Sequence, residues 1–304
     1  MVSPSRVLIT GADGFTGRHM AEEMTQHGYE VYGTVLSGEL GSREFKVDLL
    51  DHDRLRDVVE EVAPSIVIHL AGISFVHGSN FQTMYGVNIV GTRNLLSALS
   101  MAKLSIERVL LPSSAVVYGN VSQPLISESC KVIPTNDYGV SKVAMEMMAK
   151  NWFDDLPITI TRPFNYTGLN QDSVFVIPKI VDHFKLRKEA IELGSRNVRR
   201  EFNDVRDVCG IYRKLCDSER AVSQTVNVCS GRPICLDEVI DRLETSAGYK
   251  IERVLNSDFV RIGEIDTLAG DCTFMNYLVG SEDFIKFDDT VDWMLHDGVH
   301  RLTL

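Results

Sequence analysis

Two side chains able to move a proton lie four residues apart in the run Tyr138-Gly139-Val140-Ser141-Lys142. In a helix this spacing places both on one face, with the Lys142 ammonium beside the Tyr138 phenol. A phenol has a pKa of about 10, and a nearby positive charge favours its ionised form, so we expect Lys142 to lower the pKa of Tyr138. Such a tyrosine can give or take the proton of an alcohol. A solvated helix face has the same spacing, so catalysis must be argued from the surrounding elements.

A glycine-rich loop near the N-terminus supplies that context. Residues 5–10 predict a short buried strand, the run Gly11-Ala12-Asp13-Gly14-Phe15-Thr16-Gly17 follows, and a helical pattern continues from Arg18 to Gly28. In a strand-turn-helix unit, Gly11 permits the tight turn, Gly14 lets backbone approach a pyrophosphate, and Gly17 lets the helix pack on the strand. The loop is a variant of the dinucleotide fingerprint and predicts an NAD(P) site.

The second strand, expected over residues 30–35, should end above the adenosine ribose. An acidic residue there favours NAD and a basic one favours NADP. Leu36 and Ser37 carry neither charge. Because no carboxylate repels a 2′-phosphate, and Ser37 and Arg43 lie within reach, the sequence slightly favours NADP(H) over NAD(H).

Three later strands are each followed by residues suited to a cofactor. The strand over residues 45–49 ends in Asp48-Leu49, where the acid can accept a hydrogen bond from an adenine amino group. The strand over residues 65–70 precedes Ala71-Gly72, whose small size allows close approach. The strand over residues 108–111 leads into Ser113-Ser114 and a segment ending at Gly119. Their order along the chain supports the dinucleotide interpretation.

With these motifs the chain resembles the extended short-chain dehydrogenase/reductases, and among them the nucleotide-sugar epimerase/dehydratase/reductase group. The similarity spans nearly the whole chain, and its motifs occur in order. The matching residues are the glycine loop, Asp48-Leu49, His69-Leu70-Ala71-Gly72, Asn88-Ile89-Val90-Gly91-Thr92, Ser113-Ser114 with Val117-Tyr118-Gly119, Tyr138 with Lys142, and Arg162-Pro163-Phe164-Asn165.

The resemblance implies three catalytic residues. Ser114 would hydrogen-bond the reacting oxygen, Tyr138 would exchange its proton, and Lys142 would lower the tyrosine pKa and hold the nicotinamide ribose. Cofactor contacts are expected from Gly11, Asp13, Gly14, Phe15, Thr16, Gly17, Ser37, Asp48, Leu49, Leu70, Ala71, Gly72, Asn88, Ser113, Tyr138, Lys142 and Pro163.

Substrate contacts follow from the same resemblance. The segment Arg200 to Val208 resembles a reductase motif in which Arg200 would bind the diphosphate, for which a forked guanidinium is well suited. Arg261 would make another phosphate or ribose contact, whereas Arg206 is expected to pair with neighbouring acids. As alternatives, Asn165 is a turn residue and the arginines are surface charges. The other expected substrate contacts are Ser74, Val76, Ser114, Asn165, Val174 and Lys179.

Residues absent from the motifs narrow the reaction. Dehydratases of this group carry an acid pair or a Glu directly after the catalytic Thr, where this chain has Ala115 and Val116. The Cys and His of relatives that epimerise before reducing are also absent. Ketone reduction or 4-epimerisation with retained NAD remains. The segments 164–168, 175–178 and 226–231 are most similar to reductases of GDP-4-keto-6-deoxymannose that form GDP-rhamnose. Reductases of dTDP- or CDP-linked sugars, and a non-catalytic NAD(P)-sensing regulator, stay as alternatives.

Bulk properties fit a cytoplasmic enzyme. The chain has 304 residues, 44% of them hydrophobic, and can bury a large core. A net charge of -11 argues against a nucleic-acid or membrane-surface partner. The six cysteines show no metal-binding spacing, so reduced thiols and no metal are expected. We expect no signal peptide and no membrane span.

Strand-helix alternation predicts an α/β fold with a Rossmann-like, doubly wound parallel sheet and a smaller C-terminal substrate lobe. The NAD(P)-binding domain should comprise residues 1–164, with 201–229 returning to it, and the substrate lobe residues 165–200 and 230–304. Helices expected over residues 87–103 and 138–151 carry long apolar stripes. In relatives these two helices form a four-helix bundle across a dimer, so we expect a homodimer; a buried core helix is the alternative.

Overall fold

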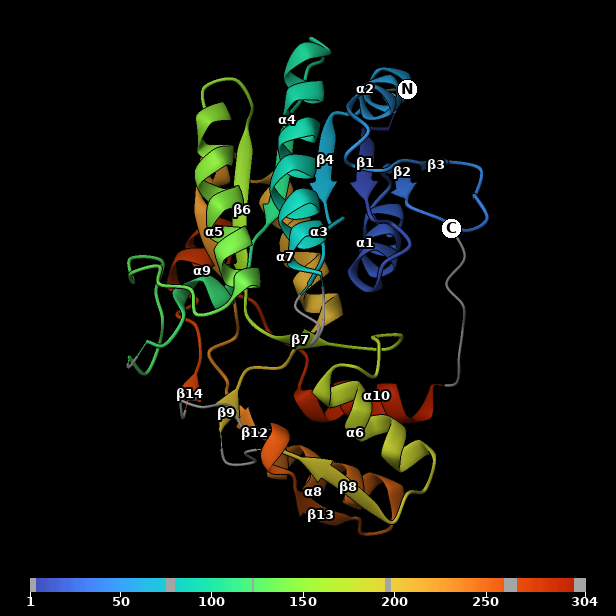
Figure 1. Cartoon of the computed structure of the whole chain (residues 1–304), viewed down its shortest axis with the longest axis vertical. Helices are drawn as coiled ribbons and strands as arrows, with labels where there is room; N and C mark the ends of the chain where they lie inside the picture. The colour runs from blue at the N-terminus through green and yellow to red at the C-terminus, as the bar shows by residue number, and fades with distance from the viewer. Residues whose placement is uncertain (1–3, 75–79, 122, 195–197, 260–266, 298–304) are drawn as a thin grey trace.

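The computed structural model describes residues 4–74, 80–121, 123–194, 198–259 and 267–297 (Figure 1). Its centre is a seven-stranded sheet with the order β11-β6-β5-β4-β1-β2-β3, parallel at every pairing. This order confirms the predicted doubly wound sheet. The strands are β1 (Arg6–Thr10), β2 (Glu30–Val35), β3 (Glu44–Lys46), β4 (Ile66–His69), β5 (Arg108–Pro112), β6 (Ile158–Pro163) and β11 (Thr225–Val228).

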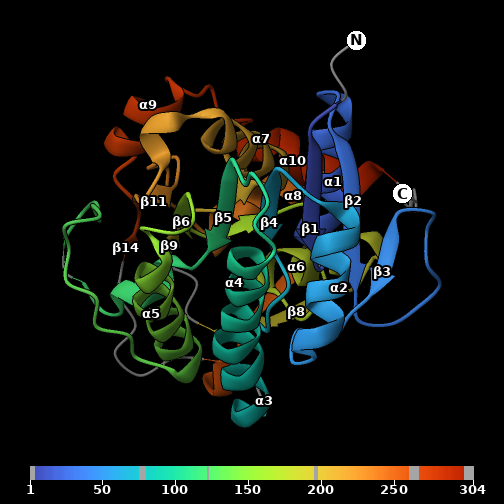
Figure 2. The same ribbon diagram turned by 90° about the horizontal axis from the view of Figure 1, so that it is seen from above.

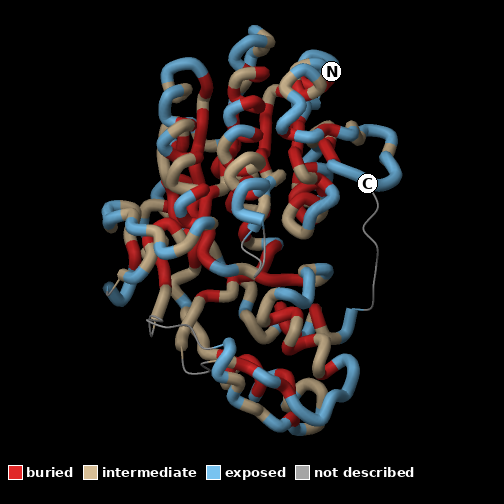
Figure 3. Tube along the Cα trace, viewed as in Figure 1, coloured by how far each residue is buried: buried red, intermediate tan, exposed pale blue. Residues whose placement is uncertain are grey.

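Helices cover both faces of the sheet. On one face lie α2 (His52–Val62), α4 (Thr92–Met101) and α5 (Asp137–Ala149); on the other lie α1 (Phe15–Gln26), α7 (Val205–Asp217) and α9 (Thr273–Val279) (Figure 2). Alternate strand residues serve the two cores: Val7 and Ile9 face α1 and α7, whereas Leu8 belongs to the α2 and α4 side. A parallel sheet covered on both faces needs such apolar strands, which are the buried centre of Figure 3.

The helix predicted over residues 87–103 differs in the structure. It begins with the short helix α3 (Phe81–Tyr85), passes through a π-helical turn, η1 (Gly86–Gly91), and continues as α4. The Thr92 hydroxyl donates to the Asn88 carbonyl at 2.8 Å. π-Helical turns are frequent at functional sites, and this one turns Asn88 inward.

The smaller lobe lies beyond the carboxyl ends of the strands, in the lower half of Figure 1. Its core joins α6 (Val176–Lys185), α8 (Leu236–Ala247) and α10 (Phe287–His296) to the parallel pair β8 (Ala190–Leu193) and β13 (Glu252–Leu255). Two small sheets connect the lobes: β7 (Tyr166–Thr167) with β10 (Asn203–Asp204), and β9 (Arg199–Arg200) with β12 (Ile234–Cys235) and β14 (Thr267–Leu268). Short 3-10 turns are η2 (Ala115–Tyr118), η3 (Lys150–Trp152), η4 (Glu219–Ala221) and η5 (Ser257–Phe259).

The C-terminal part also contributes to the first lobe. Met275 and Leu278 of α9, with Phe284, share the apolar core of α1 and α7. The sequence had assigned this stretch to the substrate lobe. The chain therefore enters the first lobe again at α9 and returns to the smaller lobe at α10.

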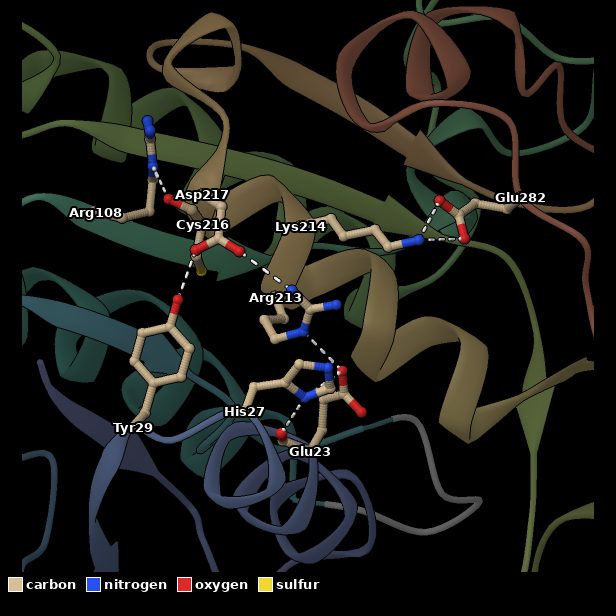
Figure 4. Close-up of polar contacts among 9 residues, drawn as sticks. All are labelled: Glu23, His27, Tyr29, Arg108, Arg213, Lys214, Cys216, Asp217 and Glu282. Atoms are coloured by element: carbon tan, nitrogen blue, oxygen red, sulfur yellow. Dashed lines mark hydrogen bonds and ion pairs between the residues drawn. The ribbon is translucent and has the colours of Figure 1, made fainter. Parts of the chain in front are cut away.

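Polar contacts join α7 to α1, to Tyr29 and to β5 (Figure 4). Arg213 lies 2.8 Å from a Glu23 carboxylate oxygen of α1 and 3.2 Å from Asp217, whose other oxygen accepts the Tyr29 hydroxyl at 2.6 Å. Arg108 of β5 donates to the Cys216 carbonyl at the end of α7. These contacts hold α7, the helix that follows the substrate-lobe segment, against the first lobe.

None of the six cysteines is in a disulfide. Among the residues that the structure describes, no helix is long and apolar enough to cross a membrane, and no cluster of His, Cys, Asp or Glu is arranged to hold a metal ion.

Candidate active site

Tyr138 and Lys142 lie in the first two turns of α5, and Lys142 contacts the carboxyl end of β5. The Asn136 side chain caps the helix by accepting the Gly139 N–H at 2.8 Å, which sets where the helix begins. Lys142 Nζ donates to the Pro112 carbonyl at the end of β5 (2.8 Å) and lies 5.9 Å from the centre of the Tyr138 ring. The predicted proximity of the two side chains is present.

Ser114 completes the group. It caps the 3-10 turn η2, where its Oγ accepts the Val116 N–H at 3.2 Å, and its side chain also hydrogen-bonds Tyr138. The carboxyl ends of parallel strands meet at one edge, so β5 brings Ser114 to the same place as the first turn of α5. The structure therefore gathers the three residues expected to be catalytic.

The electrostatics of the pair differ from the prediction. Burial raises the pKa of Tyr138 above its usual value, a nearby Tyr166 adds to this, and only the Ser114 hydrogen bond lowers it. Burial also lowers the pKa of Lys142 to about 8, an effect that the charge of Glu146 opposes. The expected net lowering of the Tyr138 pKa is wrong for this structure, because burial dominates.

The glycine loop has the tight packing that its motif predicts. Gly11 has φ 68°, and a Cβ there would lie 2.8 Å from the Ala71 backbone. A Cβ on Gly17 would come within 2.1 Å of the Gly11 carbonyl oxygen. Gly14 caps α1 without a side-chain hydrogen bond, so the first backbone N–H groups of α1 can bind an anion such as a diphosphate.

Asn88 ties the loop after β4 to α5. Its Oδ1 accepts the Ile73 N–H (2.8 Å), and its Nδ2 donates to the Ile73 carbonyl and to the Ser141 hydroxyl, both at 3.0 Å. Ser141 in turn donates to the Tyr138 carbonyl. A Cβ on Gly72 would lie 3.2 Å from Asn88 Oδ1 and 3.9 Å from Lys142 Nζ, so glycine keeps the space beside this ammonium open.

A histidine that sequence reasoning gave no role completes this network. The Thr92 hydroxyl donates to the Asn88 carbonyl, so it accepts from His69 Nε2 (2.9 Å), and His69 Nδ1 accepts from the Thr10 hydroxyl (2.7 Å). Burial, followed by the charge of Lys142, lowers the pKa of His69 to about 3. A neutral His69 thus links the ends of β1 and β4 to α4. Its place in the His69-Leu70-Ala71-Gly72 motif was the available signal.

The residues around the nicotinamide position fit a dinucleotide. The Ser113 hydroxyl is buried and has no hydrogen-bond partner among the described residues. Pro163 is buried at the end of β6, and the Leu70 N–H is bonded to the Thr10 carbonyl. These strand ends and the N-terminus of α1 would hold NAD or NADP.

The adenosine end corrects one part of the cofactor argument. Arg43 forms an ion pair with Glu30 (3.2 Å) and its guanidinium lies over the Tyr32 ring, so it is already engaged and gives no support for NADP. Ser37 is exposed. Asp13 and Asp48 are exposed, the latter accepting the Leu50 N–H, while Leu49 is buried in the core.

The expected substrate residues are spread around the lobe junction. Ser74, Asn165 and Val174 are exposed. Lys179 donates to the Glu192 carbonyl and lies over the Phe259 ring, and Arg200 donates to the Arg199 carbonyl. Arg206 binds Asp204 through two hydrogen bonds, which confirms its structural role. Val76 and Arg261 lie outside the described residues.

Tyr166 is a site residue that sequence reasoning missed. Its hydroxyl lies 2.9 Å from the Thr16 hydroxyl, and its ring stacks on Phe15 with centroids 6.1 Å apart. It therefore joins β7 to the N-terminus of α1, and it lies close enough to Tyr138 to raise the pKa of that residue. Its position directly after Asn165 in the quoted motif was the only signal.

The chain is similar to proteins of one known family. A family model described as "NAD dependent epimerase/dehydratase family" matches residues 7–229. The chain is 32% identical to a GDP-6-deoxy-D-talose 4-dehydrogenase of Aggregatibacter actinomycetemcomitans, over 91% of this chain and 92% of the relative. It is 29% identical to a GDP-6-deoxy-D-mannose reductase of Pseudomonas aeruginosa, over 98% of each chain.

Solved structures agree. A protein of Burkholderia cenocepacia J2315 is 41% identical with a TM-score of 0.91, covering 97% of this chain and 98% of that one. RMD from Pseudomonas aeruginosa, solved in complex with NADPH, is 29% identical with a TM-score of 0.85 over 96% of both chains. With a matching model over most of its length and the glycine loop, Ser114, Tyr138 and Lys142 in place, this chain belongs to the NAD dependent epimerase/dehydratase family.

Proposed function

We propose that the protein catalyses the NAD(P)H-dependent reduction of the 4-keto group of a nucleotide-activated 4-keto-6-deoxyhexose. One observation carries the proposal: Ser114, Tyr138 and Lys142 meet at the end of β5. The two residues that follow Ser114 in the sequence are Ala115, which is buried, and Val116, and neither has a carboxyl group. The site has a proton donor for a ketone oxygen and lacks the carboxyl that water elimination would need at these positions. Reduction at one carbon fits this set.

The roles of the residues follow from their geometry. Bound NAD(P)H would supply the hydride. Ser114 and Tyr138 would hydrogen-bond the ketone oxygen, and Tyr138 would donate its proton as the alcohol forms. A raised tyrosine pKa keeps the phenol protonated, which suits a proton donor in the reductive direction. Lys142 would stabilise the phenolate that is left.

The relatives support a GDP-linked substrate. The names of both curated relatives specify a GDP-6-deoxyhexose. We favour GDP-4-keto-6-deoxymannose, reduced to GDP-rhamnose in cytoplasmic deoxysugar and polysaccharide biosynthesis. The GDP-6-deoxy-D-talose 4-dehydrogenase supports a second candidate, reduction to the opposite configuration at carbon 4.

NADPH is the cofactor that we test first, because RMD from Pseudomonas aeruginosa was solved with it. The alternative is a 4-epimerase that retains NAD, and these two functions predict different behaviour of the cofactor. A reductase consumes added NADPH or NADH, one equivalent for each ketone reduced. An epimerase keeps its NAD through purification and needs none added.

The test is turnover of the purified protein with GDP-, dTDP-, CDP- and UDP-linked 4-keto-6-deoxyhexoses and either NADPH or NADH. We expect oxidation of the cofactor with the GDP sugar and a GDP-6-deoxyhexose as product. Failure to oxidise the cofactor with all four sugars would overturn the proposal. Interconversion of NDP-hexoses without added cofactor would identify an epimerase. A cellular role that Tyr138→Phe leaves intact would indicate a non-catalytic regulator.

A further inference from the structure

The catalytic face of α5 continues beyond Lys142 to a buried acid. Tyr138, Lys142 and Glu146 follow one another at four-residue spacing, so all three lie along one side of the helix. Glu146 is 3% exposed. Arg162 of β6 binds both of its carboxylate oxygens, at 3.0 Å through Nε and at 2.6 Å through a terminal nitrogen. A carboxylate so buried stays ionised only if it is paired in this way.

Arg162 is itself held from the other side. It donates to the Tyr118 hydroxyl at 3.1 Å, and its guanidinium carbon lies 4.9 Å from the centre of the Tyr118 ring. Tyr118 donates to Asn227 of β11 at 2.7 Å. This chain of contacts through β6, η2 and β11 restricts the movement of the Glu146 side chain.

The titratable and charged groups around Lys142 come from several elements. On α5 these are Tyr138 and Glu146; β4 contributes His69, which is neutral, and β6 contributes Arg162. Tyr118 of η2 and Tyr166 of β7 are neutral phenols. The Glu128 carboxyl interacts electrostatically with Arg162. Among the described residues, Glu146 is the charged group that favours the Lys142 ammonium.

We propose that Glu146, oriented by Arg162, is a positioning residue that keeps Lys142 protonated for catalysis. The inference rests on the proposed function, since it gives Lys142 a catalytic role. Burial already lowers the pKa of Lys142 to about 8 while Glu146 is present. Loss of the Glu146 charge would leave Arg162 unneutralised, and Lys142 would become largely neutral at the pH of the cell.

The experiment measures Lys142 directly. Protein labelled with ¹³C at lysine Cε is titrated by NMR, with the Lys142 signal assigned from Lys142→Arg. In Glu146→Gln we expect the pKa of Lys142 to fall by about one unit or more. Glu146→Gln/Arg162→Met removes both charges, and there we expect a smaller fall. The double variant also relieves the unpaired Arg162, so it provides the measurement if the single variant does not fold.

The matched control is Glu23→Gln. It breaks the half-buried pair with Arg213 between α1 and α7, far from the catalytic face, and should leave Lys142 unchanged. In enzyme assays, the alkaline limb of the kcat/KM profile of Glu146→Gln should move down in pH with the NMR value, and Glu146→Asp should restore part of it.

A Lys142 pKa that stays within about 0.3 unit of wild type in the Glu146→Gln or double variant overturns the inference. The titration needs no substrate, so it gives an answer even if no 4-keto sugar is reduced and the proposed function fails. Conversely, ketone reduction with an unchanged Lys142 titration would leave the proposed function intact and refute the role of Glu146.

Discussion

Tyr138 is a phenol on which burial, the neighbouring Tyr166 and the Ser114 hydrogen bond all act. Burial dominates, so the group is a protonated donor that needs a cation only when its proton leaves. Lys142, 5.9 Å from the ring centre, is placed for that moment. At the residue scale the arrangement fits our proposal that Tyr138 protonates a ketone oxygen.

The pair Thr16 and Tyr166 provides a test at this scale. Their hydroxyls are 2.9 Å apart and join the substrate side to the N-terminus of α1. We expect Tyr166→Phe and Thr16→Val each to weaken NADPH binding by about 5- to 10-fold, because one hydrogen bond contributes roughly 1 kcal/mol. Equilibrium fluorescence titration of NADPH checks this.

Because both variants remove the same hydrogen bond, Thr16→Val/Tyr166→Phe should weaken binding no more than either single variant. Tyr249→Phe, remote from α1, is the control. Fully additive losses, or unchanged NADPH affinity in Tyr166→Phe, would show that the bond has no part in cofactor binding.

At the element scale, each helix near the site begins at a residue that defines its first turn. Asn136 caps α5, Ser114 caps η2, and Gly14 leaves the N-terminus of α1 free of a side-chain cap. The two capped starts orient catalytic groups, and the uncapped start is suited to a phosphate.

The Asn136 cap gives a second prediction. Asn136→Ala removes the acceptor for the Gly139 N–H, and we expect the free energy of unfolding to fall by about 1 kcal/mol. Because the first turn of α5 carries Tyr138, kcat should fall more than the cofactor affinity. Asn136→Ser or Asn136→Asp should restore both quantities. Thermal denaturation and steady-state kinetics measure them, and full activity in Asn136→Ala would contradict the link between cap and catalysis.

Much of the fold could be predicted at this scale from local patterns. The strand over residues 30–35 was predicted at its observed bounds, because an apolar run ended by turn residues defines it well. The glycine loop and the spacing of Tyr138 and Lys142 depend on contiguous residues and were readable. The π-helical turn was not predicted; its Asn88 side chain bonds Ile73 of the loop after β4, a contact that no local spacing indicates.

The same reasoning explains what was missed in the site. The Glu146–Arg162 pair joins α5 to β6, and Thr16 meets Tyr166 across 150 residues of chain. Contacts of this kind depend on tertiary packing and leave no local spacing signal. The pKa of Tyr138 was predicted in the wrong direction for a related reason, because the spacing reports the nearby charge and gives no measure of burial.

At the scale of the whole molecule, the junction between the lobes contains an unusual acid. Asp207 of α7 accepts the Ile285 N–H at 2.9 Å. Burial, together with the charges of Asp204 and Glu282, raises the pKa of Asp207 to about 7. The Ile285 hydrogen bond and the charge of Arg206 act in the opposite direction. A folded-state pKa above the unfolded value means that the folded chain holds this proton more tightly. Stability should therefore decline as the pH rises from about 4 to about 7.

Asp207→Asn keeps the acceptor and removes the charge. We expect this variant to be more stable than wild type by about 2 kcal/mol at pH 8 and nearly equal to it at a pH of about 3, where Asp207 is largely protonated in both states. Thermal melts at both pH values measure the difference, with the exposed Asp154→Asn as control. An equal gain at the two pH values would show that the charge of Asp207 is not the cause.

The outer face of α4 and α5 predicts the assembly. Val90, Met101, Val140 and Met147 are between 41% and 67% exposed and lie on neighbouring elements, which Figure 2 shows side by side. Such a patch indicates an interface, and we propose a homodimer through it. Analytical ultracentrifugation should give a dimer for wild type and a monomer for Met147→Glu. Leu186→Glu, an equally exposed position at the end of α6, should stay dimeric. A monomeric wild type would contradict the proposal.

The most direct test of the account follows one hydride and one proton in wild type and Tyr138→Phe, using GDP-4-keto-6-deoxymannose and NADPH that carries deuterium at the transferred position. Wild type should place deuterium at carbon 4 of a GDP-6-deoxyhexose, and Tyr138→Phe should lower kcat at least about 100-fold with NADPH affinity nearly unchanged. Tyr85→Phe removes a hydroxyl that donates to the Asp137 carboxylate at the start of α5, and this variant should behave as wild type. Wild-type turnover by Tyr138→Phe, or a product without deuterium at carbon 4, would contradict the assignment of Tyr138 as the proton donor in a ketone reduction.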